Sequence, residues 1–255
     1  MHRYFLKEFL DLGAGLITLE QWGVNGNKID VDEFMNNYTR TQRLRDHKTV
    51  INHLLKNPPI GWNGKLIFVG GSEGVPLVTS LTIEYSDITI ATVNWSGADD
   101  GNWRDEVWEF IKGISDEIML SIPWHIRIRS KLPTWVPYSV ILQIPKSKEE
   151  CVNFLNETLK NPTAEKKFMG MTYMYHADVL NWPKTKYEKI KTPYLVVSGA
   201  KDTAVKFSDE FVEKAKKASI NIDYMRVEDM DHYIRKRPDI LEKSFDWIRE
   251  ILKNK

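Results

Sequence analysis

Short apolar runs alternate with amphipathic segments along most of the chain. The apolar runs have the length and composition of buried β-strands, and the segments after them place apolar residues at helical spacing. The strand-like runs lie at residues 65–69, 87–93, 193–198 and 222–227, and the helix-like segments at about 75–81, 207–218 and 238–252. Because alternating strands and helices build parallel sheets, the pattern predicts an α/β fold with a doubly wound, mostly parallel sheet.

The N-terminal part of the chain predicts a helix, a short strand and a longer helix. Apolar residues recur at helical spacing over 4–12, and a β-prone run at 15–19 follows. After a polar stretch, a helical pattern extends over about 31–55 and is broken by Pro58 and Pro59. We therefore expect 15–19 to be the first strand of the sheet.

The block from about 103 to 191 interrupts the strand pattern. Its sequence is mostly helical, rich in aromatic residues and broken by several prolines. This block is too long to be a single crossover between neighbouring strands. The sequence therefore predicts an α/β core formed by residues 1–102 and 192–255, with residues 103–191 inserted as a helical cap.

Composition excludes several classes of protein. The formal charge is +1, from 36 Lys and Arg against 35 Asp and Glu, with no long run of one sign, which argues against a nucleic-acid partner. Cys151 is the only cysteine, so no intrachain disulfide can form. No stretch approaches the roughly 18 apolar residues of a membrane span, and the N-terminus lacks the features of an export signal, so a cytoplasmic protein is expected.

The segment Gly70-Gly71-Ser72-Glu73-Gly74 matches the pattern G-x-S-x-G. In that pattern a nucleophilic serine lies on a sharp turn between a strand and a helix, whose crowding favours glycine two residues before and after. The bare pattern arises by chance in roughly a few chains per hundred, but here it also has the required strand before it and helix after it. The turn places the backbone N–H of Glu73 at a helix N-terminus, where it could donate to a developing oxyanion.

A serine hydroxyl needs a base to take its proton, and the base needs an acid to orient it. Asp202 follows the strand pattern at 193–198, and His232 follows the last one. The order serine, acid, histidine fits a catalytic triad with Ser72 as nucleophile, His232 as general base and Asp202 as the orienting acid. Taken alone, Asp202 could cap the next helix and His232 could be a solvated loop residue. Asp99 and Asp100, which follow the strand after the serine turn, are the rival acids.

These features together resemble the α/β-hydrolase superfamily over nearly the whole chain. The serine turn, the acid after a strand, the histidine after the last strand and the helical insertion all match that pattern. The segment from Gly170 to Tyr175 and the Ser-Glu-Gly of the turn look most like bacterial esterases, dienelactone hydrolases and the prolyl oligopeptidase group.

The chain departs from that family at its N-terminus. In the family, a loop after an earlier strand supplies the second oxyanion N–H and precedes the first helix, and this chain begins at about that helix. The second donor could come from another loop, such as 23–26, or the natural protein could be longer. A sheet that begins at 15–19 would leave one edge uncovered, and such an edge predicts a homodimer, poor solubility or a longer chain.

The leading hypothesis is a serine hydrolase that cleaves an ester, thioester or amide of a small acyl substrate through an acyl-enzyme. It requires no metal and no cofactor. The alternative from another class is a non-catalytic binding protein or truncated pseudoenzyme with an incomplete oxyanion hole. Acyl transfer to an acceptor other than water would use the same residues.

Overall fold

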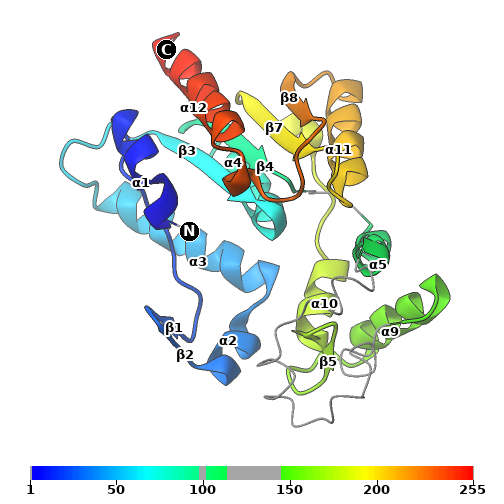
Figure 1. Ribbon diagram of the computed structural model, residues 1–255. Helices are drawn as coiled ribbons and strands as arrows, with labels where there is room; N and C mark the ends of the chain where they lie inside the picture. Colours follow the sequence, from blue (N-terminus) through cyan, green and yellow to red (C-terminus); the bar gives the residue numbers. More distant parts are fainter. Residues whose placement is uncertain (1, 98–101, 114–144, 255) are drawn as a thin grey trace.

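The computed structural model describes residues 2–97, 102–113 and 145–254, and its centre is a parallel sheet (Figure 1). The four strands stand in the order β3-β4-β7-β8, and every neighbouring pair is parallel. The strands are β3 (Leu66–Gly71), β4 (Thr89–Trp95), β7 (Tyr194–Gly199) and β8 (Ile222–Val227). The predicted α/β fold is therefore confirmed, and all four predicted strands of the sheet lie within two residues of their expected bounds.

Helices cover both faces of this sheet, which explains why its central strands are apolar throughout. In β7, Leu195 and Val197 pack with α1 and α12, while Tyr194 and Val196 face the other way and pack with α11. The helices of the two layers are α1 (His2–Asp11), α12 (Pro238–Lys253), α3 (Arg40–Lys56), α4 (Val75–Glu84) and α11 (Val205–Lys217). Burial on both faces is typical of parallel sheets with a crossover helix after each strand.

The predicted helix over 31–55 is two helices. α2 (Val31–Asn37) ends before Thr39, and α3 begins at Arg40. Thr39 has an extended backbone, and its hydroxyl accepts a hydrogen bond from the Gln42 N–H (3.1 Å), which makes it the N-cap of α3. The apolar spacing continues through the break, so periodicity alone did not reveal it.

The prediction of a strand at 15–19 is wrong. Residues 14–20 belong to neither helix nor strand, and the sheet instead begins at β3. Leu16 packs on the core beside α1 and α12, whereas Ile17 is exposed. The segment leads to a small antiparallel hairpin, β1 (Val24–Asn25) with β2 (Lys28–Ile29), at the tip of which Gly26 has a φ of 58°. A β-prone run forms no strand without a neighbouring strand to bond.

The edge strands of the sheet are consequently β3 and β8. Within the ranges that the structure describes, β3 pairs only with β4 and β8 pairs only with β7. The homodimer expected from an uncovered edge stays a prediction, with one of these two strands as the one that would take part. Across the described ranges, no helix combines the length and apolar content that crossing a bilayer requires.

A set of helices without strands of the main sheet lies between β4 and β7 in the sequence and stands apart from the sheet in Figure 1. Its described elements are α5 (Trp103–Gly113), α9 (Lys148–Lys160), the hairpin β5 (Lys167–Phe168) with β6 (Met171–Thr172), and α10 (Tyr173–Leu180). We call these elements the helical segment. Its small core includes Cys151, which is fully buried, and burial raises the pKa of that thiol to about 11, so it is a packing residue.

His176 of α10 ties the helical segment together. Its Nε2 is 2.9 Å from the carbonyl oxygen of Phe168, and its Nδ1 accepts from the Trp103 indole (3.2 Å). These contacts require the neutral ring with its proton on Nε2. Burial lowers the pKa of His176 to about 4, and only 2% of the residue is exposed. His176 is thus a packing residue of the helical segment.

We expect His176 to make the protein less stable in mild acid. Its folded pKa is below its unfolded value of 6.5, so the unfolded chain binds more protons as the pH falls from 6.5 towards 4. At pH 5 this costs about 2 kcal/mol of unfolding free energy relative to pH 7. Urea unfolding at both pH values checks it, with His176→Gln as the control that lacks the titrating ring. The wild type should lose about 2 kcal/mol more than the variant, and equal losses would contradict the assignment.

Candidate active site

Ser72 lies on a sharp turn between β3 and α4. A single turn of 3-10 helix, η1 (Ser72–Gly74), joins the two elements, and Ser72 has a φ of 50°, in the left-handed region that non-glycine residues rarely adopt. A strained residue held at such a turn is a recurrent feature of functional sites. The turn exposes the Ser72 side chain at the carboxyl end of the strand.

The two glycines of the turn are not equivalent. A Cβ added to Gly70 would come within 2.6 Å of the Val78 side chain on α4, so the close packing of strand on helix requires glycine there. A Cβ on Gly74 would meet nothing within 4 Å, and its φ is −79°. The expectation that crowding demands glycine on both sides of the serine is therefore correct for Gly70 and wrong for Gly74.

The structure brings Ser72, His232 and Asp202 together. The distance from Ser72 Oγ to His232 Nε2 is 2.9 Å, and the distance from His232 Nδ1 to Asp202 Oδ2 is 2.7 Å. All three residues follow the carboxyl ends of strands: Ser72 follows β3, Asp202 follows β7 and His232 follows β8. Parallel strands end at the same edge of a sheet, which explains how residues 160 positions apart in the sequence meet.

Burial differs along this chain of hydrogen bonds. Ser72 is exposed, the His232 side chain is 33% exposed, and the Asp202 side chain is 4% exposed. Both oxygens of Asp202 are occupied, because Oδ1 accepts from the Ala204 N–H (2.9 Å) and Oδ2 meets the histidine. Asp202 therefore contacts the histidine as the predicted acid, and it holds the turn before α11 without being the N-cap of that helix, which is Ala204.

Asp202 controls the protonation of His232. The hydrogen bond that His232 Nδ1–H donates to Asp202 raises the pKa of His232, partial burial lowers it, and the net effect is an increase above 6.5. A carboxylate that raises the basicity of the ring strengthens it as an acceptor of the Ser72 proton. Because only the neutral ring can accept that proton, reactivity of Ser72 should rise with pH through this raised pKa.

The remaining candidates from the sequence are placed as follows. Asp99 and Asp100, the rival acids, lie outside the described residues. Glu73 follows Ser72 in the first turn of helix, where backbone N–H groups have no intrahelical acceptor. In the loop suggested as a second oxyanion donor, the N–H of Gly26 already donates to Glu20 (3.2 Å), which argues against that loop.

Sequence reasoning missed the side chains around Glu73. Its carboxylate binds Arg40 (Nε to Oε1, 3.0 Å) and Arg43, and also receives hydrogen bonds from Tyr38 and Tyr175. We call these five residues the Glu73 cluster. The only sequence signal was a glutamate at a position next to the nucleophile, and its partners lie 30 to 102 positions away.

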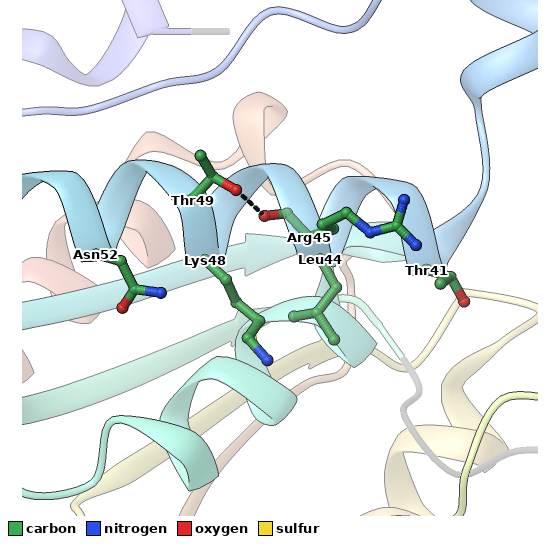
Figure 2. Close-up of a pocket in the computed structure, with 6 residues that line it drawn as sticks. All are labelled: Thr41, Leu44, Arg45, Lys48, Thr49 and Asn52. Atoms are coloured by element: carbon green, nitrogen blue, oxygen red, sulfur yellow. Dashed lines mark hydrogen bonds between the residues drawn. The ribbon is translucent and has the colours of Figure 1, made fainter.

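Two cavities lie away from the triad. One, of about 390 Å³, runs along α3 and is lined by Thr41, Leu44, Arg45, Lys48, Thr49 and Asn52 (Figure 2). Another, of about 430 Å³, lies between α3 and residues 19–24. Neither is lined by a triad residue, so neither identifies a substrate site. Among the described residues, no three His, Cys, Asp or Glu side chains gather as metal ligands would.

A parallel sheet covered on both faces, a serine on a tight turn after one strand, and an acid and a histidine after the last two strands are the architecture of the α/β-hydrolase fold. The chain has this fold, and solved structures share it. A carboxylesterase from Nitrososphaera gargenis superposes with a TM-score of 0.59 and 13% identity, covering 100% of this chain and 86% of that one.

Two further structures show the same likeness. An esterase from Pyrococcus furiosus gives a TM-score of 0.58 at 16% identity, covering 99% of this chain and 75% of that chain. Mouse α/β-hydrolase domain-containing protein 10 gives 0.54 at 16%, covering 99% and 83%. No protein-family model matches the sequence, and no curated protein matches it. At these identities the similarity establishes the fold, and the resemblance to dienelactone hydrolases and prolyl oligopeptidases stays a prediction.

Proposed function

We propose that this protein is a serine hydrolase that cleaves a carboxylic ester, thioester or amide through an acyl-enzyme. The observation that carries the proposal is the unbroken chain of hydrogen bonds from Ser72 through His232 to Asp202, with Ser72 exposed on its turn. A serine hydroxyl becomes a useful nucleophile when a base can take its proton, and this arrangement supplies the base. The similarity in fold to carboxylesterases and esterases supports the same class of reaction.

The proposed reaction has two halves. Ser72 Oγ attacks the carbonyl carbon while His232 Nε2 takes the hydroxyl proton, and Asp202 stabilises the imidazolium through Nδ1. The N–H of Glu73 donates to the oxyanion of the tetrahedral intermediate. His232 then gives its proton to the leaving group, which departs and leaves the acyl group on Ser72. In the second half, His232 activates water to attack that ester, and the acid product leaves with Ser72 restored.

In this proposal the helical segment is the cap of an α/β core formed by residues 1–102 and 192–255. Its aromatic side chains would then face the acyl substrate and determine which acyl and leaving groups fit. The chemistry needs no metal and no cofactor, because nucleophile, base and acid all come from the chain.

A fluorophosphonate probe tests the proposed function directly. The probe reacts with an activated serine, forming a phosphorus–oxygen bond and releasing fluoride. We expect labelling of the wild type, with the label located on Ser72 by mass spectrometry of the digested protein, and no labelling of Ser72→Ala. Absence of labelling in the wild type at every pH at which the fold is retained would favour the alternative of a non-catalytic binding protein. Product analysis with an added alcohol separates hydrolysis from acyl transfer.

A further inference from the structure

The Glu73 cluster joins three parts of the molecule at the residue whose N–H is the candidate oxyanion donor. Tyr38 ends α2, Arg40 and Arg43 lie in the first turn of α3, and Tyr175 comes from α10 of the helical segment. Arg40 and Arg43 are three positions apart on α3 and so share a face of that helix. One carboxylate therefore connects the turn after β3 to three other elements, α2, α3 and α10.

All the accepting positions of the Glu73 carboxylate are used. Oε1 accepts from Arg40 Nε (3.0 Å) and from the Tyr175 hydroxyl (3.2 Å). Oε2 accepts from Arg43 Nη1 and, at 3.5 Å, from the Tyr38 hydroxyl. A carboxylate offers about four lone-pair sites, so four donors saturate it and fix its orientation. The hydrogen bonds have a charged acceptor, and two also have charged donors, which makes them stronger than neutral ones.

The surroundings hold the donors in turn. Only 7% of the Arg40 side chain and 13% of the Arg43 side chain are exposed. The Arg40 guanidinium lies over the rings of Trp103 and Trp182, and Tyr38 stacks on Tyr175 with ring centroids 5.7 Å apart. Burial is the main cause that raises the pKa values of Tyr38 and Tyr175, with the Glu73 charge adding to it, so both hydroxyls stay protonated donors.

A second hydrogen bond joins α10 to the first turn of α3. The Asp178 carboxylate accepts a hydrogen bond from the Thr41 N–H (3.1 Å) in the first turn of α3. Tyr175 and Asp178 are three positions apart and lie on one face of α10. That face is thereby bound to the start of α3 by Asp178 and to the serine turn by Tyr175.

The charges of the Glu73 cluster bear on the stability of the oxyanion. An unpaired carboxylate beside the oxyanion would repel the negative charge that develops there. Pairing with Arg40 and Arg43 neutralises the Glu73 carboxylate, which removes that repulsion.

From these contacts we propose that Glu73 is a positioning residue. Its saturated carboxylate fixes the direction of its own N–H towards the oxyanion and links α10 of the helical segment to the nucleophile. This rests on the proposed serine hydrolase function. Because catalysis depends on atoms held within a fraction of an ångström, loosening this residue should slow the chemical steps while leaving substrate binding nearly unchanged.

The test is steady-state hydrolysis of p-nitrophenyl acetate by the full chain as a function of pH. Glu73→Gln keeps the size of the side chain but turns an NH2 group towards the arginines. We expect kcat to fall roughly 10- to 100-fold, with KM changed by less than about threefold. The pH at which kcat/KM rises should stay that of the wild type, because the groups that raise the pKa of His232 are Asp202 and Asp231. A purely structural role would not produce this separation of kcat from KM and pH.

Tyr175→Phe removes one of the four donors to the Glu73 carboxylate. We expect its kcat to fall by less than that of Glu73→Gln, again with little change in KM. The matched control is Tyr224→Phe, which removes a tyrosine-to-carboxylate hydrogen bond of 2.6 Å between β8 and α11, away from the turn, and should leave kcat unchanged. Turnover by Glu73→Gln within twofold of the wild type would overturn the positioning role, as would a fall shared equally by the control. If the wild type shows no turnover that depends on Ser72, the proposed function fails, and the positioning role with it.

Discussion

Replacing Asp202 by asparagine should lower kcat/KM for p-nitrophenyl acetate by about 10⁴-fold while the fold is retained. Asparagine has nearly the same shape, so packing around the residue is conserved. Its amide cannot stabilise the imidazolium, and it allows the wrong tautomer of His232, which then no longer accepts the Ser72 proton. The pH at which activity rises should also move down, because the hydrogen bond that His232 donates to Asp202 is the main cause of the raised pKa of His232.

The controls for this prediction are Asp99→Asn and Asp100→Asn, made singly. Both residues were rival acids in the sequence, whereas the structure places Asp202 Oδ2 at 2.7 Å from His232 Nδ1. We expect each control to keep kcat/KM within a few-fold of the wild type. A large loss in Asp99→Asn or Asp100→Asn with a small loss in Asp202→Asn would reverse the assignment of the acid.

A methyl group on Gly199 should disturb both stability and activity. Gly199 ends β7, and a Cβ there would lie 2.1 Å from the carbonyl oxygen of Met230 and 2.5 Å from that of Asp231. The backbone of this loop cannot move aside easily, because the Met230 carbonyl also accepts from the Lys201 N–H (3.0 Å). Overpacking against backbone should cost roughly 3 kcal/mol of unfolding free energy.

Gly199→Ala should also lower turnover roughly 100-fold, because it pushes the loop after β8, which carries His232, away from the end of β7, which Asp202 follows. Urea unfolding and p-nitrophenyl acetate hydrolysis measure the two effects for Gly199→Ala. Gly15→Ala is the matched control, since a Cβ there meets nothing within 4 Å. Equal behaviour of the two variants would show that the loop after β8 is not held close to β7.

The order of the triad along the chain could be predicted because each part depends on a local pattern. An apolar run of strand length before Gly70 and a helical pattern after Gly74 identify the serine turn without any knowledge of distant residues. Asp202 and His232 each follow such a run, and in a parallel sheet the carboxyl ends of strands share an edge. These rules led to the three side chains that the structure brings within hydrogen-bond distance.

Local sequence patterns gave wrong predictions where the secondary structure depends on contacts outside the segment itself. The run at 15–19 has β-prone residues, but a strand exists only when another strand accepts and donates its hydrogen bonds, and in the structure this segment has none. The periodicity over 31–55 continued across Thr39, where the side-chain cap of α3 decides the break. A Cβ on Gly74 would likewise meet nothing within 4 Å, although the sequence motif predicts crowding at that position.

The sequence by itself determined the α/β class, the four strands of the sheet and the residues at their carboxyl ends, because hydrophobic periodicity and turn residues act over a few positions. Only the tertiary structure decided which strands form the edges of the sheet, which acid meets His232, and that Glu73 is saturated by donors from α2, α3 and α10. The contacts of Asp202 and Glu73 join residues 30 to 102 positions apart, and such contacts follow from how the layers pack rather than from any local pattern.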